Sequence, residues 1–320
     1  MKVSILTDGF IVKCPDEALA ALKSEVPEAE INCIAGSAAG LAELADSDVV
    51  YGWLPQDMIR QLKNLKWLHL PSAGANNYTD VSLYVNPSII LTKSSGTFGI
   101  PIAEHVIGMM IALSRNFALY HNAQKEGKWN RDRTEAIDIY NSNILLLGLG
   151  DIGTQVCRRL AGFDCNIIGF RRDASVPHEL VSEVRPMSRL RESLPEADYV
   201  LICLPGTEET SKVMGREEFS VMKKQAIVIN IGRGTIIDTD ALVDALNEGR
   251  IAGAGLDVTD PEPLPPDHPL WSAANVLITP HISSLSPRND GRRLAIFTDL
   301  LKRYVSGREM YNIVDFSSGY

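Results

Sequence analysis

The sequence has 320 residues, of which 45% are hydrophobic and 22% are charged, and its formal net charge is −9. This composition is that of a globular protein, so it excludes extended disorder and collagen-like structure, and the length predicts two domains. The acidic charge and the lack of an apolar run of about 18 residues argue against nucleic-acid binding and a membrane-spanning helix.

Short apolar runs alternate with amphipathic stretches along the chain, a pattern that predicts parallel sheets with helical crossovers. In the first part of the chain we expect strands at residues 3–6, 48–51, 68–70 and 89–91 and a helix at 16–24. A long apolar helix is expected at 102–114, directly after Pro101, a residue that suits the first turn of a helix.

The strands expected after this helix are more apolar, which is typical of strands buried on both faces. They are residues 144–147, 166–170, 199–204, 226–231, 252–257 and 276–279, with a weaker strand at 183–184. Helices are expected at 154–161, 239–248 and 292–305. The whole pattern is that of an α/β protein.

The five cysteines have no CxxC spacing, and most lie in or beside apolar runs. The apolar part of the first ten residues is too short for a signal peptide. We therefore expect a cytoplasmic protein with no disulfides and no metal.

A glycine-rich turn, Gly148-Leu149-Gly150-Asp151-Ile152-Gly153, lies between the strand expected at 144–147 and the helix expected at 154–161. A GxGxxG in that context binds the pyrophosphate of a dinucleotide. Gly148 allows the tight turn, Gly150 lets the backbone approach the phosphates, and Gly153 lets helix and strand pack closely. The helix N-terminus offers unpaired N–H groups to the phosphates. A purely structural turn is the alternative.

The residue expected to contact the adenosine ribose follows the next strand, which ends at Phe170. NAD-binding folds carry Asp or Glu there, roughly 20 residues after the glycine turn. This sequence has Arg171 and Arg172, whose guanidinium groups suit a 2′-phosphate, so we predict a preference for NADP(H) over NAD(H). The alternative is two solvated arginines, one of them able to pair with Asp173.

Three later strands end in polar residues, at the sheet edge where ligands bind in open α/β folds. Arg233 suits a substrate carboxylate, and His281 suits proton donation to a ketone oxygen during hydride transfer. Glu262 would orient this imidazole and favour its protonated form. A turn arginine, a solvated glutamate and a loop histidine are the alternatives for each residue taken alone.

In order and spacing, these motifs resemble those of the D-isomer-specific 2-hydroxyacid dehydrogenases, and the resemblance covers essentially the whole chain. Besides the glycine turn, the matching blocks are Pro101-Ile102-Ala103-Glu104-His105, Asn230-Ile231-Gly232-Arg233-Gly234, Leu256-Asp257-Val258, Glu262-Pro263-Leu264-Pro265, His268-Pro269-Leu270-Trp271, Thr279-Pro280-His281 and Asn312-Ile313-Val314-Asp315.

The resemblance implies two doubly wound parallel-sheet domains. A Rossmann cofactor domain (99–290) would be inserted in a discontinuous flavodoxin-like substrate domain (1–98 and 291–320). It implies a homodimer, with the helix from Ile102 onward near the contact. His105 belongs to that helix, and we expect it to pack rather than to take part in catalysis.

The resemblance also implies roles for individual residues. Arg233, Glu262 and His281 would be catalytic, and the backbone at Ser72, Ala73 and Gly74 would cradle the substrate carboxylate. Asp257 would meet the nicotinamide carboxamide. His69, beside that backbone loop, is an outside candidate for substrate contact. The residues also expected at the cofactor, at or after strand ends, are Leu204, Pro205, Thr210, Ile231 and His281.

The function predicted is the reduction of small 2-ketoacids to D-2-hydroxyacids, as in glyoxylate/hydroxypyruvate reductases. A nucleotide-sensing corepressor-like protein and a dehydrogenase of an unusual substrate, such as phosphite or formate, are the alternatives. Because the sequence ends at Tyr320, we expect no regulatory extension of the kind found in long phosphoglycerate dehydrogenases. The side chains expected around the substrate are Tyr51, Trp53, Leu54, Tyr78, Trp271 and Leu285, whereas Trp67 and Trp129 are expected in the core.

Overall fold

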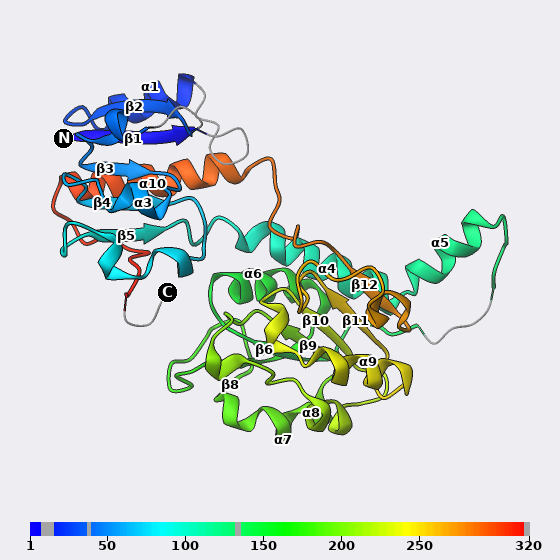
Figure 1. Ribbon diagram of the computed structural model, residues 1–320. Coiled ribbons are helices and arrows are strands. Elements are labelled where there is room, and N and C mark those ends of the chain that lie inside the picture. Colours follow the sequence, from blue (N-terminus) through cyan, green and yellow to red (C-terminus); the bar gives the residue numbers. More distant parts are fainter. Residues whose placement is uncertain (8–15, 37–39, 132–135, 317–320) are drawn as a thin grey trace. The chain divides into compact units, whose positions relative to one another are not determined.

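The structure, a computed structural model, describes residues 1–7, 16–36, 40–131 and 136–316 (Figure 1). The chain divides into two compact units. The first, here called the terminal unit, combines Met1–Phe98 with Ser286–Tyr320. The second, the central unit, is Gly99–Leu285. Each unit is described by itself.

The terminal unit contains a five-stranded sheet of order β2-β1-β3-β4-β5, in which every pairing is parallel. This is the flavodoxin-like order. The strands are β1 (Lys2–Thr7), β2 (Glu30–Ala35), β3 (Val49–Tyr51), β4 (Trp67–Leu70) and β5 (Ile90–Lys93), and the helices are α1 (Asp16–Glu25), α2 (Leu41–Leu44), α3 (Gln56–Ile59) and α10 (Asn289–Val305).

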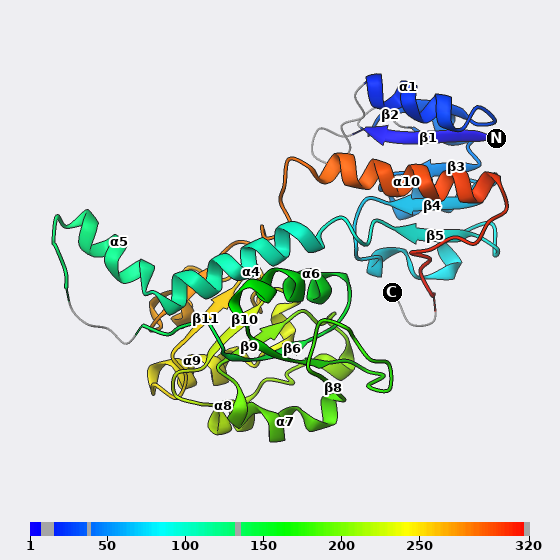
Figure 2. The ribbon, with the colours of Figure 1, turned by 180° about the vertical axis from the view of Figure 1, so that it is seen from behind.

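Helices α1 and α10 cover the same face of this sheet, and both lie in front of it in Figure 2. Phe297, Leu300 and Leu301 of α10 are fully buried in a cluster with Val3 and Trp67 of the sheet. The C-terminal helix is thereby part of the core built by the N-terminal strands.

The central unit contains a seven-stranded parallel sheet of order β12-β11-β10-β9-β6-β7-β8. The strands are β6 (Asn143–Leu147), β7 (Asn166–Phe170), β8 (Glu183–Arg185), β9 (Tyr199–Ile202), β10 (Ile227–Asn230), β11 (Gly253–Leu256) and β12 (Val276–Ile278). The chain runs outward from β6 to β8, returns to β9 on the other side of β6, and continues outward to β12. This is the Rossmann order with an added strand, and its switch point lies between β6 and β9.

Helices cover both faces of the central sheet (Figure 2). They are α4 (Gly99–Ser114), α6 (Asp151–Leu160), α7 (Leu190–Ser193), α8 (Arg216–Val221) and α9 (Thr239–Asn247), whereas α5 (Phe117–Lys125), which follows α4, stands away from the sheet. Helices α4 and α6 pack together on one face, while residues of α7, α8 and α9 form the core cluster of the other. The expected fold class, two doubly wound parallel sheets of Rossmann and flavodoxin-like type, is confirmed.

Strand β2 and helices α2, α3, α5, α7 and α8 were not predicted from the sequence, and two of them show why. The segment of β2 reads EINCIA, and only one of its six residues is buried because it is an edge strand covered on one side. Helix α5 has none of its residues buried, so it lacks the apolar stripe by which amphipathic helices are found. Helix α4 begins at Gly99 rather than 102 and includes Pro101 in its first turn.

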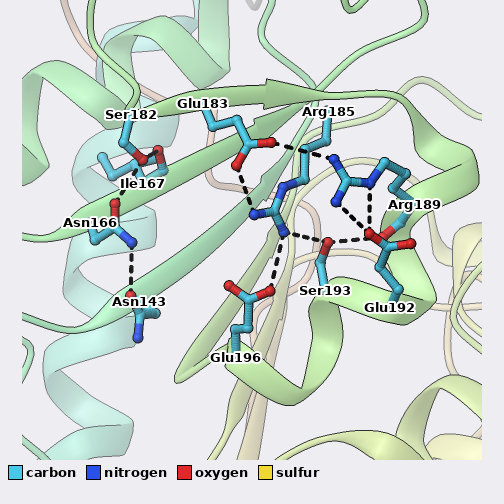
Figure 3. A network of polar contacts seen from close by, with 10 residues as sticks. All are labelled: Asn143, Asn166, Ile167, Ser182, Glu183, Arg185, Arg189, Glu192, Ser193 and Glu196. Carbon is cyan, nitrogen blue, oxygen red and sulfur yellow. Dashed lines mark hydrogen bonds and ion pairs between the residues drawn. The ribbon is translucent and has the colours of Figure 1, made fainter.

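The edge strand β8 is held by a buried arginine (Figure 3). The Arg185 guanidinium donates to Ser193 Oγ at 2.7 Å, to Glu183 Oε2 at 2.7 Å and to Glu196 Oε1 at 3.3 Å. The hydrogen bond from Arg185 lowers the pKa of the Glu183 carboxyl below its usual range. A buried charge needs such partners. The Arg185 carbonyl accepts from the Arg171 N–H at 3.3 Å, so this network also fixes the segment after β7.

Two further findings concern the described residues. No helix in the described ranges has both the length and the apolar character needed to cross a membrane. The cysteines that the structure describes, at positions 33, 157, 165 and 203, form no disulfide, and Cys14 lies outside the described residues.

Candidate active site

The glycine turn lies between β6 and α6, at the switch point of the central sheet. Gly148 has φ of +105°, a conformation that L side chains rarely adopt. A Cβ at Gly153 would lie 2.1 Å from the Gly148 carbonyl oxygen, whereas a Cβ at Gly150 would meet no atom within 4 Å. Gly150 is also the N-cap of α6, and no side chain caps this helix. The turn thus presents open backbone and an uncapped helix N-terminus, a combination that fits a pyrophosphate.

The other residues of this turn differ in exposure. Leu149 is buried, with its methyl groups so close to Gly169 that a Cβ there would lie 2.5 Å from one of them. Asp151 is exposed in the first turn of α6, and Ile152 is half-buried. Leu149 therefore anchors the turn on β7, and Gly150 and Asp151 form its open side.

The two arginines after β7 have different surroundings. The exposed Arg172 guanidinium lies 3.4 Å from Glu209 Oε2. The Arg171 side chain has no hydrogen bond or ion pair to any residue that the structure describes. Asp173 accepts from the N–H and Oγ of Ser175 at 3.0 and 2.6 Å. These hydrogen bonds, and next the charge of Arg171, lower the pKa of the Asp173 carboxyl.

The four other residues expected at the cofactor lie at the ends of β9 and β10. Leu204 and Ile231 are mostly buried, with 8% and 5% of their surfaces exposed. Pro205 is exposed, and its carbonyl accepts a hydrogen bond of 2.7 Å from Thr210 Oγ1. The same Oγ1 accepts from the Thr207 N–H at 2.9 Å, so Thr210 closes the turn that follows β9.

Arg233 is exposed in a tightly packed turn after β10. A Cβ at Gly232 would lie 2.5 Å from the Leu204 carbonyl oxygen, and one at Gly234 would lie 2.0 Å from that of Thr259. The buried Asn230 side chain fixes the turn, because it donates to the Arg233 carbonyl at 2.9 Å and accepts from the Gly232 N–H at 3.0 Å. The sequence motif contained Asn230, but its positioning role is visible only in the structure.

His281 and Glu262, expected to pair, lie in contact. His281 Nδ1 is 2.6 Å from Glu262 Oε1, and the side chains are 47% and 42% exposed. Since a carboxylate only accepts, the imidazole donates through Nδ1–H, and Nε2 is left for another partner. The loop that carries Glu262 is held by Thr239 Oγ1, which donates to the Asp260 carbonyl at 3.0 Å, and by Trp271 Nε1, which donates to that of Pro265 at 2.8 Å.

Asp257 holds the turn that contains His281. Its carboxylate is 1% exposed and accepts from Thr279 Oγ1 at 2.6 Å, from the Ile282 N–H at 2.9 Å and from the Ser283 N–H at 3.0 Å. The His281 N–H donates to the Asp257 carbonyl at 2.8 Å. These contacts support the positive φ of 53° at His281, which is strained for a non-glycine residue. Asp257 thus orients the histidine, and its contact with nicotinamide stays a prediction.

His105 has a polar role that the sequence did not indicate. Its Nε2 lies 3.0 Å from Thr279 Oγ1 and 3.9 Å from Asp257 Oδ1. Because the Thr279 hydroxyl hydrogen goes to the Asp257 carboxylate, His105 Nε2–H donates to Thr279. His105 thus helps to hold the turn that carries His281, and its expected absence from the catalytic residues stays a prediction. The 174 residues between the two side chains explain why no local pattern reveals the contact.

In the terminal unit, the loop after β4 has hydrogen-bonded carbonyl groups but N–H groups without an acceptor among the described residues. The carbonyls of Ser72 and Gly74 accept from the Ser94 N–H at 2.9 Å and from Ser72 Oγ at 2.7 Å. The N–H groups of Ser72, Ala73 and Gly74 have no acceptor among the residues that the structure describes. Backbone N–H groups without an acceptor are available as donors to an anion, so this loop is suited to a carboxylate.

Several expected pocket residues are core residues instead. Tyr51 and Leu54 are 0% and 3% exposed, because Tyr51 stacks on Phe297 and Leu54 packs in the other core cluster of the terminal unit. The remaining side chains are partly or well exposed, namely Trp53 at 41%, Trp271 at 54% and Leu285 at 70%, with Tyr78 half-buried. Trp53 Nε1 lies 3.4 Å from Ser72 Oγ, beside the N–H groups of the loop.

The two tryptophans expected in the core differ. Trp67 is fully buried, as expected, whereas Trp129 is 88% exposed, so that expectation is wrong. Among the described residues, no group of three or more His, Cys, Asp or Glu side chains is arranged to hold a metal ion.

The sequence and the structure were compared with those of known proteins, and the matches name related dehydrogenases and reductases. Residues 107–283 match the family described as D-isomer specific 2-hydroxyacid dehydrogenase, NAD binding domain. The chain is 33% identical over 271 residues to glyoxylate/hydroxypyruvate reductase B of Yersinia pestis, a match that covers 82% of each chain. It is 33% identical over 281 residues to D-3-phosphoglycerate dehydrogenase of Methanocaldococcus jannaschii, covering 86% of this chain but 53% of that protein. The chain thus spans about half the length of the latter relative.

A solved structure shows the same fold over the whole chain. It is that of NADPH-dependent glyoxylate/hydroxypyruvate reductase from Sinorhizobium meliloti, in complex with NADP and sulfate. The sequence identity is 25%, the TM-score is 0.80, and the match covers 100% of each chain.

Proposed function

The chain belongs to the D-isomer-specific 2-hydroxyacid dehydrogenase family of oxidoreductases, and from this premise we propose that it reduces small 2-ketoacids to D-2-hydroxyacids with NADP(H). In this proposal the central unit binds the cofactor and carries Arg233, Glu262 and His281, and the terminal unit supplies the loop at residues 72–74 for the substrate carboxylate. The observation that carries it is the 2.6 Å contact between His281 Nδ1 and Glu262 Oε1, on a turn shaped by Asp257. Such a pair supplies a proton to a ketone oxygen.

The residues of this chain have distinct tasks in the proposed reaction. When bound, the nicotinamide ring supplies the hydride to the carbonyl carbon of the ketoacid. His281 Nε2–H donates its proton to the carbonyl oxygen as negative charge develops there. Glu262 accepts from Nδ1–H, which orients the ring and stabilises the imidazolium before transfer. In the reverse direction His281 Nε2 accepts the hydroxyl proton of the D-2-hydroxyacid.

Two cationic or N–H-rich groups would bind the ketoacid itself. The Arg233 guanidinium forms bidentate hydrogen bonds with the carboxylate and polarises the neighbouring carbonyl. The N–H groups of Ser72, Ala73 and Gly74 bind the carboxylate in the same way as other backbone anion sites. Trp53, 41% exposed beside Ser72, would contact the substituent of the substrate.

The preference for NADP(H) rests on Arg171. Its guanidinium has no hydrogen bond or ion pair within the described ranges, and it follows β7, the strand after which NAD-binding folds carry an acidic residue. Arg172 is a weaker candidate because it already lies 3.4 Å from Glu209. The NADPH-dependent relative from Sinorhizobium meliloti supports the same assignment. Reduction is the physiological direction we propose, in the cytoplasm.

The proposed homodimer is supported by the surface after α4. Helix α5 stands away from the sheet of its own unit (Figures 1 and 2). Its residues Phe117, Leu119 and Tyr120 are 54%, 38% and 39% exposed, and Trp129 beyond it is 88% exposed. Contiguous exposed apolar residues mark an interaction surface, and a second copy of the chain is the partner we propose.

The proposal is tested by the oxidation of NADPH and, in parallel, of NADH at 340 nm with a panel of 2-ketoacids. The panel contains glyoxylate, hydroxypyruvate, pyruvate, 2-ketoisocaproate and phenylpyruvate. We expect turnover with NADPH to exceed turnover with NADH, and the product to be the D-hydroxyacid. Nucleotide binding without turnover on any of these acids would contradict the reductase assignment and favour a nucleotide sensor or another hydride donor.

A further inference from the structure

His69, on β4, is surrounded by uncharged groups. It is 0% exposed, and its ring lies 4.9 Å from that of Tyr51 and 5.4 Å from that of Phe297, measured between centroids. Burial lowers the pKa of His69 to about 3, so its imidazole is neutral. The expectation that His69 is a candidate for substrate contact is therefore wrong. A buried neutral imidazole must instead have partners for one donor and one acceptor nitrogen.

Both ring nitrogens of His69 have hydroxyl partners on the neighbouring strand and its end. Nδ1 lies 2.7 Å from Thr92 Oγ1, and Nε2 lies 3.0 Å from Ser94 Oγ. Ser94 Oγ donates its single hydrogen to the Leu70 carbonyl at 2.9 Å. The contact with Ser94 therefore requires a hydrogen on His69 Nε2, so Nε2 is the protonated nitrogen and Nδ1 the acceptor.

The rest of the chain of hydrogen bonds follows from this tautomer. Trp67 Nε1 lies 2.8 Å from Thr92 Oγ1 and can only donate. Thr92 accepts from Trp67 and donates to His69 Nδ1, and His69 Nε2–H donates to Ser94. Hydrogen bonds thus run in one direction from Trp67 to the Leu70 carbonyl, through buried groups, where such networks are strongest.

This series of hydrogen bonds ends beside the loop at residues 72–74. Ser94 holds two carbonyls on either side of Pro71, that of Leu70 through its hydroxyl and that of Ser72 through its N–H, at 2.9 Å each. In a trans peptide the C=O and the next N–H point in opposite directions. By fixing the Ser72 carbonyl, Ser94 therefore turns the Ala73 N–H to the other side, away from Ser94.

We propose that His69 is a positioning residue for the loop at Ser72, Ala73 and Gly74: through Ser94 it sets the direction of the N–H groups that bind the substrate carboxylate. This inference rests on the proposed function for the identity of the anion. His69 touches neither substrate nor cofactor, and it acts through Ser94. An apolar side chain of similar size would fill the site but would leave Ser94 Oγ without its donor.

Four variants separate positioning from general stability. Asn at position 69 offers Thr92 an acceptor but is too short to reach Ser94, whereas Gln places an N–H near the Nε2 position. His69→Asn and Ser94→Ala remove the link between position 69 and Ser94. His69→Gln and Thr92→Val keep a donor to Ser94. Thr92→Val serves as the control because it removes an equally buried hydroxyl, 0% exposed, on the opposite side of His69 from Ser94.

Steady-state kinetics with hydroxypyruvate or pyruvate provide the first readout. Misdirected N–H groups weaken binding of a carboxylate that is unchanged in the transition state, so KM rises while kcat stays constant. We expect KM to rise about tenfold in His69→Asn and Ser94→Ala, with kcat within about twofold, and to change less than twofold in His69→Gln and Thr92→Val. An equal rise of KM in Thr92→Val would show a general structural effect and overturn the proposal.

Amide hydrogen exchange provides a readout that does not depend on activity. The Ser94 N–H, bonded to the Ser72 carbonyl, should lose protection in His69→Asn and Ser94→Ala relative to Thr92→Val. Equal exchange in these variants would overturn the role of His69 whatever the enzyme reduces. Selective loss of protection without turnover on any ketoacid would support the positioning role and contradict the proposed substrate instead.

Discussion

Replacement of Arg171 by alanine should change the cofactor preference more than any other single substitution in the central unit. The Arg171 guanidinium has no hydrogen bond or ion pair within the described part of the chain, so its full capacity is available to a 2′-phosphate. A hydrogen bond to a charged group contributes about 1.5–3 kcal/mol, which corresponds to a loss of about 10- to 150-fold in NADPH affinity. NADH has no 2′-phosphate, so its affinity should change less than about threefold.

Arg172→Ala is the matched control. Arg172 lies 3.4 Å from Glu209, and both side chains are more than two-thirds exposed, at 70% and 77%. Exposed ion pairs contribute about 0.2–1 kcal/mol. An exposed Arg172 that is already paired with Glu209 should contribute no more than this to NADPH binding, so Arg172→Ala should lower NADPH affinity less than about fivefold. Each of the two variants removes one positive charge, so a difference between them does not come from net charge.

The assay is a titration of each variant with NADPH and NADH, followed by nucleotide fluorescence, at constant ionic strength because charge contributes to binding. The quantity compared is the ratio of the two dissociation constants. An unchanged ratio in Arg171→Ala, or a larger change in Arg172→Ala than in Arg171→Ala, would refute the assignment of Arg171 to the 2′-phosphate.

Three further predictions concern catalysis, pH and packing. Glu262→Gln should lower kcat about 100-fold or more with nucleotide affinity unchanged, because the ring loses its charged partner; a kcat within threefold of wild type in stopped-flow assays would contradict this role. His69 has a folded-state pKa of about 3, below the unfolded value of 6.5, so its contribution to stability is complete above pH 6.5 and is lost as the pH falls toward 3. Urea unfolding should therefore show wild type losing about 2 kcal/mol more than His69→Gln between pH 7 and 5, and parallel pH curves would show that the pKa of His69 is the same in the folded and unfolded states. Gly153→Ala should reduce both Tm and NADPH binding, since the added Cβ would lie 2.1 Å from the Gly148 carbonyl oxygen, whereas Gly162→Ala, with no atom within 4 Å, should change neither.

Motifs that are recognised by the strand and the helix next to them in the sequence could be predicted. The turn from Gly148 to Gly153 follows an apolar strand and opens a helix, and both neighbours are needed to distinguish it from an ordinary turn. The fold class followed from near-continuous apolar runs, since β9 and β10 are buried along their whole length. Strand β2 and helix α5 were missed because each buries little of its own surface.

Contacts between distant segments could not be predicted. His105 and Thr279 are 174 residues apart, and only the tertiary structure brings the imidazole to the hydroxyl that Asp257 binds. His69 was considered for substrate contact because it precedes the loop at 72–74 by a few residues. Its burial depends on α10, whose Phe297 lies on its ring, and sequence proximity carries no information about that packing.

His281 is the acid/base of the proposed ketoacid reductase. The decisive measurement is the initial rate of NADPH oxidation by wild type and by His281→Asn, with the ketoacid that wild type reduces fastest and with NADPH binding measured in the same samples. We expect His281→Asn to bind NADPH as wild type does and to lose about 1,000-fold or more in kcat. A kcat of His281→Asn within tenfold of wild type, with NADPH bound, would show that His281 is not the acid/base.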